Sequence, residues 1–133
     1  DLAATFCAVA GAPIPPSFMG QSLLPLVSDS PDRNSQFAIR PSIFSTYHGN
    51  QFGLYSQRMV RDRRWKYIWN ATAEDELYDL QNDVGELTNL AASVDHADEL
   101  HRLRHQLVEW MAATQDRLLN GWTKNQLLGG YKL

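Results

Sequence analysis

The sequence predicts an α+β fold, in which a small antiparallel sheet of about four strands packs against a long C-terminal helix. Two observations predict this class. The middle of the chain contains short segments of alternating character separated by brief links, as antiparallel strands do. The last third instead carries apolar residues at helical spacing. A remnant of a helix and an extended linker are expected to precede the sheet.

Four segments are expected to form the strands, at residues 39–47, 54–61, 64–69 and 76–80. In the third segment Trp65, Tyr67 and Trp69 alternate with other residues, so we expect them on one face of the sheet. The link between the second and third strands consists only of Asp62 and Arg63, which is short enough for a hairpin.

The last third is expected to form one long helix of about four turns. Its apolar positions recur every three or four residues from Leu100 to Thr114. Asp98 and Glu99 suit the positive end of the helix dipole. The apolar stripe needs a partner surface, and one face of the sheet is the natural candidate. Residues 120–133 contain three glycines and are expected to form an irregular tail.

The first residues are expected to be the end of a helix. Residues 1–10 are apolar and rich in alanine, and Gly11 followed by Pro13 is a typical stop signal. Residues 12–16 must be extended, since proline fixes its own φ and restricts the residue before it. Because the chain opens in mid-helix and has no initiator Met, we expect its natural N-terminus to lie upstream.

The composition is that of a globular protein and argues against several classes of function. Hydrophobic residues make up 44% of the chain and charged residues 20%. The net charge of −3 argues against a nucleic-acid-binding protein, which normally presents a basic face. The longest apolar run is broken by Gly11 and several prolines, so it is too short to cross a bilayer. We therefore expect no nucleic-acid partner and no membrane partner.

Four segments, in this order, resemble the end of one enzyme family. Residues 1–15, DLAATFCAVAGAPIP, are similar to a family segment ending in AGIPxP, with Ala4 where proline is usual. Residues 19–26, MGQSLLPL, match xGxSLLPL, and residues 58–68, RMVRDRRWKYI, resemble RMVRTxRWKYI. Residues 76–91, ELYDLQNDVGELTNLA, resemble ELYDLxNDPxExxNLA. The chain thus resembles the C-terminal subdomain of a type I sulfatase, an arylsulfatase-like member of the alkaline-phosphatase-like superfamily.

The resemblance implies three parts. Residues 1–36 would be a remnant of the catalytic α/β domain and the linker from it, residues 37–119 the sulfatase C-terminal subdomain, and residues 120–133 the tail. The missing N-terminal catalytic domain is then the main partner of this chain. Residues 1–26 should carry an exposed apolar patch where that domain docks. Without it, we expect this end to be poorly ordered or to cause self-association.

The chemistry that the resemblance implies lies upstream of this chain. Such a sulfatase hydrolyses a sulfuric ester with a formylglycine, made from Cys or Ser in a C/SxPxR motif. It also uses a divalent cation, usually Ca²⁺, held by oxygen ligands. Cys7 is followed by Ala-Val-Ala and does not match the motif, so we interpret it as a small buried hydrophobe. We assign no catalytic residue, no metal ligand and no cofactor to this fragment, and expect it to be inactive alone.

One segment could still reach the active site of the intact enzyme. Residues 47–53 join two predicted strands and combine polar, aromatic and glycine residues. In this family the C-terminal subdomain covers one side of the substrate pocket. We hypothesise that His48, and secondarily Asn50 and Gln51, contact the leaving group of the sulfate-ester substrate. A plain hairpin loop explains the same residues, since Gly49 and Asn50 favour turns.

Two alternatives to sulfuric ester hydrolysis stay open. The parent could be a sulfamidase or a phosphonate or phosphodiester hydrolase of the same superfamily. The chain could also be a non-catalytic module that binds an anionic glycan through a basic cluster around Trp65 and Tyr67. The members of that cluster are Arg58, Arg61, Arg63, Arg64 and Lys66. A strand edge protected by charge explains the cluster as well.

His101 and His105 lie four residues apart on the predicted helix, a spacing that can bind a transition metal. Nothing else nearby in the sequence completes a set of ligands. The sequence alone therefore favours a solvated flank of the helix.

Overall fold

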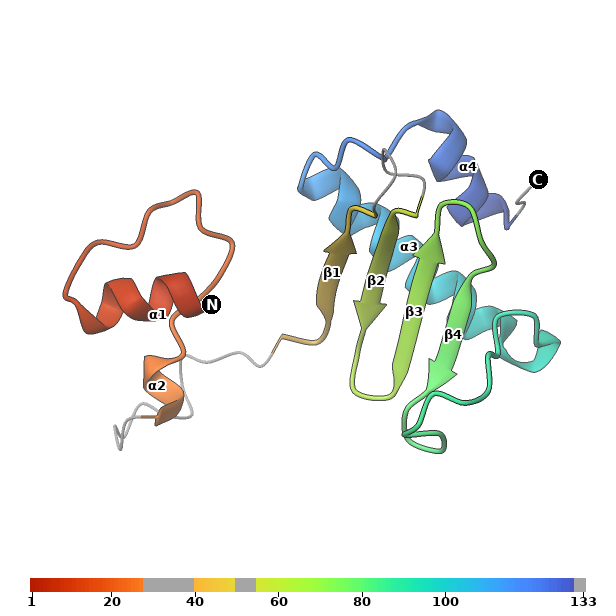
Figure 1. Ribbon diagram of the computed structural model, residues 1–133, viewed down its shortest axis with the longest axis horizontal. Coiled ribbons are helices and arrows are strands. Elements are labelled where there is room, and N and C mark those ends of the chain that lie inside the picture. The colour runs from red at the N-terminus through yellow and green to blue at the C-terminus, as the bar shows by residue number, and fades with distance from the viewer. Residues whose placement is uncertain (28–39, 50–54, 131–133) are drawn as a thin grey trace. The chain divides into compact units, whose positions relative to one another are not determined.

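The computed structural model describes residues 1–27, 40–49 and 55–130 (Figure 1). The chain forms two compact units, Asp1–Arg40 and Pro41–Leu133. The boundary predicted between residues 36 and 37 lies outside the described residues.

The second unit is built on a four-stranded antiparallel sheet in the order β1-β2-β3-β4, so that each strand pairs with its neighbour in the sequence (Figure 1). The strands are β1 (Ile43–Tyr47), β2 (Gln57–Arg61), β3 (Trp65–Asn70) and β4 (Glu76–Asp79). The carboxylate of Asp62 closes the β2–β3 hairpin, because it accepts hydrogen bonds from the backbone N–H groups of Arg64 and Trp65 at 2.8 and 2.7 Å. The hairpin predicted from this short link is confirmed.

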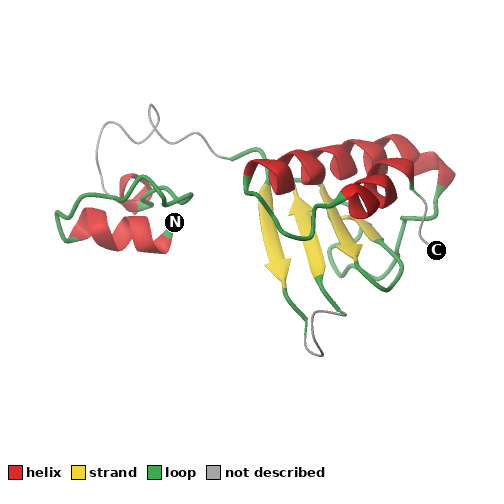
Figure 2. Ribbon diagram, turned by 90° about the horizontal axis from the view of Figure 1, so that it is seen from above, coloured by secondary structure: helices red, strands yellow, loops and turns green. Residues whose placement is uncertain are grey.

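A long helix packs on one face of the sheet. Helix α3 (Ala97–Ala113) follows the short 3-10 helix η2 (Val94–His96), and Figure 2 shows the long helix lying on a single side of the strands. Phe44 of β1 stacks on Trp110 of α3 with ring centroids 4.8 Å apart. The fully buried core side chains come from both layers: Val60, Tyr67, Leu77, Leu103, Leu107 and Met111. The predicted α+β fold is confirmed.

A further helix, α4 (Gly121–Gly129), forms where the sequence predicts an irregular tail. That prediction is wrong here because the glycines stand at the two ends of the helix rather than inside a loop. Asn120 caps the first turn, since its side-chain oxygen accepts a hydrogen bond from the N–H of Thr123 at 2.9 Å. Gly130 ends the helix with a φ of 72°, which glycine adopts without strain. Leu127 is buried and joins the helix to the core.

The first unit contains two helices, α1 (Leu2–Val9) and α2 (Leu24–Val27). Helix α1 ends as the sequence predicts, with Gly11 in a left-handed conformation at a φ of 66°. The Asp1 carboxylate accepts a hydrogen bond from the Arg40 guanidinium at 2.8 Å, and both side chains of this ion pair are partly exposed. This ion pair therefore joins the first and last residues of the unit.

The first unit leaves most of its apolar surface uncovered. Among its described residues only Ala4 is buried. Leu2, Phe6 and Val9 are 65%, 68% and 66% exposed, and their spacing of four and three residues puts them on one side of α1. The exposed apolar patch expected in this part of the chain is therefore present.

Candidate functional site

The end of β1 presents the residue that the sequence selects first for contact with a substrate. Strand β1 ends at Tyr47, and His48 follows it with an exposed side chain. Asn50 and Gln51, the other two candidates, lie outside the described residues. The structure therefore places one of the three candidates, at the start of the connection between β1 and β2.

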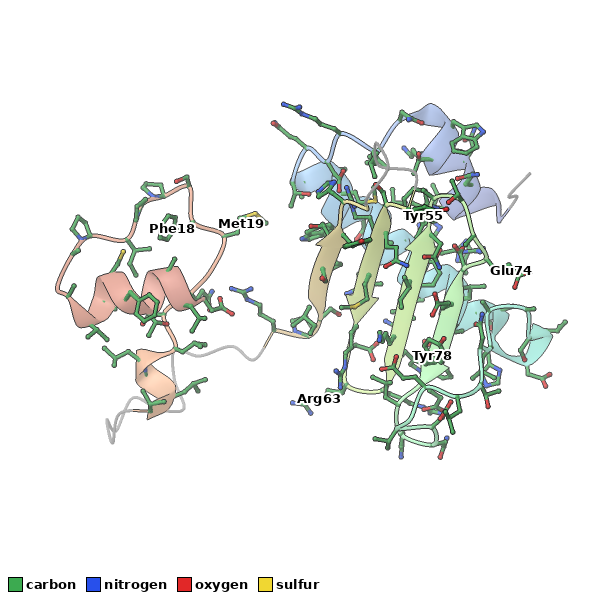
Figure 3. All side chains as sticks on the ribbon, in the orientation of Figure 1. Phe18, Met19, Tyr55, Arg63, Glu74 and Tyr78 are labelled. Carbon is green, nitrogen blue, oxygen red and sulfur yellow. The ribbon has the colours of Figure 1, made fainter. Side chains whose placement is uncertain are left out.

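The two ends of the connection between β1 and β2 lie close together. Tyr47 pairs with Gln57 across the two strands. A Cβ on Gly49 would lie 2.7 Å from backbone carbonyl atoms of Tyr55, so a larger residue fits at position 49 only if the backbone moves. Figure 3 shows Tyr55 at this end of the sheet, just before β2. The two neighbours of His48 in the sequence are thus held in place, Tyr47 against Gln57 and Gly49 against Tyr55.

A buried ion pair holds the same end of the sheet. The Nε and Nη2 atoms of Arg58 donate to the two carboxylate oxygens of Asp116, at 2.5 and 3.0 Å. The Arg58 side chain is 0% exposed and that of Asp116 is 8% exposed. The remaining nitrogen, Nη1, donates to the carbonyl oxygens of Gln57 and Tyr47 at 2.7 and 3.3 Å. Arg58 therefore ties the end of β1 and the start of β2 to the connection between α3 and α4.

The hydrogen bonds and charges around Asp116 lower the pKa of its carboxyl. Hydrogen bonds from Arg58 lower the pKa of the Asp116 carboxyl from its ordinary 3.8, outweighing burial, which acts the opposite way. A charge on His48 also lowers the pKa of Asp116, so the imidazole lies within electrostatic reach of this carboxylate. Asp116 in addition accepts a hydrogen bond from the N–H of Leu118 at 2.9 Å. Sequence reasoning missed this ion pair because its members are 58 residues apart.

The basic cluster contacts one of its two aromatic neighbours, since Cζ of Arg64 lies 4.8 Å from the centroid of the Trp65 ring. Trp65 and Tyr67 face the core and are buried, because alternation along β3 sends them toward α3. Arg64 is held by Asp79, with Nη2 and Oδ2 2.7 Å apart. Figure 3 shows Arg63 extending from the β2–β3 turn. Because both rings are buried, Trp65 and Tyr67 offer little exposed aromatic surface to a glycan.

A second polar cluster, absent from the sequence predictions, fastens α3 to the connection between β3 and β4. The Asp75 carboxylate accepts hydrogen bonds from the Tyr67 hydroxyl at 2.7 Å and from the Arg104 guanidinium at 2.9 Å. Burial, and next the charge of Asp75, raise the pKa of the Tyr67 hydroxyl well above 10.0. A cavity of about 440 Å³ lies beside this cluster, lined by Asp75, Asn89 and Arg104 among others. These hydrogen bonds account for the positions of Tyr67, Asp75 and Arg104, so no ligand is needed to explain them.

The described residues do not fit the cofactors that the resemblance implies for the parent. No group of three or more His, Cys, Asp or Glu side chains that could hold a metal ion occurs among them. A Ca²⁺ ion takes six to eight oxygen ligands, so no chemical step is assigned to such an ion here. Cys7 is a free, half-buried thiol. None of the described helices is long and apolar enough to cross a membrane.

Comparisons with known proteins agree with the fold described above. Residues 1–113 match the model of the family described as N-sulphoglucosamine sulphohydrolase, C-terminal. The chain is 32% identical over 125 residues to an uncharacterized protein of Haemophilus influenzae. The matching region covers 92% of this chain and 59% of that protein. It is also 32% identical over 117 residues to arylsulfatase K of Xenopus laevis, covering 83% of this chain and 22% of that protein.

Among solved structures, a 2-O GAG sulfatase superimposes with a TM-score of 0.73 and 30% sequence identity, over 87% of this chain and 25% of that one. This chain thus spans about a quarter of the length of the sulfatases it matches. The four-stranded antiparallel sheet with its C-terminal helix is the part of the fold that they share. From the family match over residues 1–113 and this shared fold, the chain belongs to the family of N-sulphoglucosamine sulphohydrolase C-terminal domains and is the C-terminal subdomain of a type I sulfatase.

Proposed function

We propose that this chain completes the fold and one wall of the substrate pocket of a sulfuric ester hydrolase, and that it is inactive without the rest of that enzyme. The observation that carries the proposal is its match to a part of sulfatases that makes up only 22% of arylsulfatase K and 25% of the solved 2-O GAG sulfatase. The formylglycine nucleophile and the Ca²⁺ or other divalent cation then belong to the N-terminal catalytic domain.

Helix α1 supplies the docking surface for that catalytic domain. Fully burying a large apolar side chain contributes about 1.5–3 kcal/mol, and Leu2, Phe6 and Val9 remain about two-thirds exposed in this chain. The described residues of the first unit form no core that could cover them, since Ala4 is the only buried residue among them. In this proposal residues 1–36 belong structurally to the catalytic α/β domain.

His48 is the described residue of the pocket wall that contacts the leaving group of the substrate. Its exposed imidazole can donate or accept a hydrogen bond, which suits the hydroxyl and ring oxygens of a sugar. Because Arg58 binds the carbonyl of Tyr47, His48 leaves the sheet from a fixed point. Asn50 and Gln51 are proposed as secondary contacts in the same connection.

A sulfamate is the second candidate substrate, because the matching family carries the name of an N-sulphoglucosamine sulphohydrolase. In a sulfamate the sulfur is bonded to nitrogen rather than to oxygen, and His48 would then contact the leaving amine. A phosphonate ester or a phosphodiester is a further alternative on the same scaffold. The relative rates on these four classes of substrate distinguish the candidates.

The first experiment compares this chain with the longer protein that carries it, on a chromogenic aryl sulfate with and without Ca²⁺. We expect turnover by the longer protein and none by this chain. Turnover by this chain alone would overturn the proposal. So would a longer protein that hydrolyses none of the aryl sulfate, the sulfated sugar and the N-sulfated sugar.

A second experiment tests the pocket wall. In the longer protein, His48→Ala is expected to lower kcat/KM on the native substrate about tenfold, the loss of one hydrogen bond to the leaving group. His105→Ala removes another exposed imidazole and should leave kcat/KM unchanged. If both variants have the same kcat/KM as the unaltered enzyme, His48 does not contact the substrate.

A further inference from the structure

Two histidines converge on the exposed side of α3. His101 and His105 are one helical turn apart, and both side chains are exposed. Their Nε2 atoms are 3.1 Å apart, and their ring centroids 4.3 Å apart. Two ring nitrogens this close either share one proton in a hydrogen bond or bind one cation.

The separation of the two nitrogens fits a single metal ion. Bonds from a metal to a histidine nitrogen are about 2.0–2.1 Å long. Two Nε2 atoms 3.1 Å apart then subtend an angle of about 100° at an ion bound to both. This angle lies between about 90°, the octahedral value, and about 109°, the tetrahedral one. The distance between the two Nε2 atoms is therefore one that a single ion can bridge once the rings turn toward it.

The backbone that carries the pair is firmly held. Leu100, Leu103 and Leu107 are buried on the opposite side of α3, where they pack against the sheet. Leu100 directly precedes His101, Leu103 lies between the two histidines and Leu107 follows His105 by two residues, so the spacing between the histidines is set by a packed helix. Only side-chain rotamer freedom is lost when an ion binds.

The neighbouring arginines are engaged with other partners. Arg102 binds Asp62 at 2.6 Å and Glu99 at 2.8 Å. Arg104 binds Asp75 at 2.9 Å and is largely buried. These carboxylates compensate the positive charges beside the histidine pair.

Two acids extend the same stripe of the helix. Asp98 precedes His101 by three residues and Glu109 follows His105 by four, so each lies one turn beyond the pair on the same side. Their negative charges favour a cation between them. The pattern Asp98, His101, His105, Glu109 is more favourable to a cation than the two histidines considered alone.

We propose that His101 and His105 form a two-ligand site for a divalent transition-metal ion, with Ni²⁺, Cu²⁺ and Zn²⁺ as the candidates. Imidazole nitrogen suits these ions, whereas Ca²⁺ takes oxygen ligands. No third His, Cys, Asp or Glu closes around the pair in the part of the chain that the structure describes, so water or an external ligand completes the coordination. The site is separate from the cation of sulfatase chemistry and does not depend on the proposed function.

The test titrates the tag-free chain, carrying Cys7→Ser to remove the thiol, with Ni²⁺ and Zn²⁺ in a calorimeter. We expect one ion per chain. His101→Ala or His105→Ala should each weaken binding about tenfold or more, because loss of one ligand abolishes chelation. His48→Ala and His96→Ala, which remove the other histidines, should leave the affinity unchanged.

A matched control keeps the number of histidines, changes their spacing and also removes the Glu109 carboxylate. The double variant His105→Ala with Glu109→His places the second imidazole two turns from His101, too far for one ion, and should bind as weakly as His105→Ala. In Cu²⁺-loaded chain, the electron paramagnetic resonance spectrum should show coupling to two nitrogens, reduced to one by His101→Ala. Equal metal affinity in the unaltered chain and the double variant, or coupling that His101→Ala leaves unchanged, would overturn the proposal.

Discussion

The two units of this chain treat their apolar residues in opposite ways. In the second unit, large side chains such as Tyr67, Leu103 and Met111 are fully buried between a sheet and a helix. In the first unit the large side chains lie on the outside of α1, as Phe6 does, and only the small Ala4 is buried among the described residues. The difference indicates that the second unit is stabilised by its own core, whereas the described residues of the first leave their large apolar side chains on the surface.

The ion pairs of the two units differ in the same sense. Arg40 and Asp1 form a pair in which both side chains are partly exposed, whereas Arg58 and Asp116 form one with almost no exposure. Exposed pairs contribute about 0–1 kcal/mol, but removing one member of a buried pair costs about 3–5 kcal/mol. The contrast between these two pairs offers a direct way to test where the stability of the chain resides.

The largest expected effect comes from Arg58→Met. This change leaves the Asp116 carboxylate buried without its partner and should lower the free energy of unfolding by about 3–5 kcal/mol. Arg40→Met, the matched change in the first unit, should lower it by about 1 kcal/mol at most. Urea unfolding followed by tryptophan fluorescence measures the second unit, which holds all four tryptophans, and far-ultraviolet circular dichroism follows the helices of both units. Similar losses in the two variants would contradict the contrast drawn between the units.

A smaller effect should follow acidification. Hydrogen bonds from Arg64 lower the pKa of Asp79, and those from Arg58 that of Asp116, from an ordinary 3.8. Because both pKa values are lower in the folded chain than in the unfolded chain, the unfolded chain binds more protons around and below pH 3.8. The stabilisation is therefore complete well above pH 3.8 and is lost as the pH falls below it. Thermal unfolding from pH 6 to pH 2.5 measures this loss, which should be less steep in Asp116→Asn.

The smallest effect on stability is expected in the first unit. Replacing Leu2 and Phe6 together by serine removes exposed side chains, so the free energy of unfolding of the second unit should change by less than about 0.5 kcal/mol. The same double change should reduce self-association of the chain, measured by sedimentation velocity. Serine at Val84 and Leu87, which are exposed in the second unit, is the control and should leave association unchanged. Association that is insensitive to the changes on α1 would refute its role as a docking face.

Local patterns were sufficient to predict most of the second unit. Alternation placed Trp65, Tyr67 and Trp69 on one face, and all three are buried beneath the helices. The same alternation could not reveal that Arg58 is buried, because its partner Asp116 is 58 residues away and only the fold brings them together. Glycines around α4 were misinterpreted because a glycine at a helix end and a glycine in a loop look alike in one sequence.

The candidate site was predictable to a lesser degree. The position of His48 at the end of a strand followed from turn residues in the sequence, and the structure shows its side chain exposed there. Its role in binding a substrate stays a prediction, as do those of Asn50 and Gln51. For His101 and His105, the spacing of four residues was visible in the sequence. Only the structure shows that their Nε2 atoms lie 3.1 Å apart.

The contact between Arg58 and Tyr47 also has a consequence for how such enzymes diversify. A buried guanidinium holds both ends of the β1–β2 connection, because it donates to the carbonyl oxygens of Tyr47 and Gln57. Doubling the length of a flexible loop costs only about 0.6 kcal/mol. Insertions, deletions and exchanges are therefore expected to be tolerated in this connection while the domain still folds.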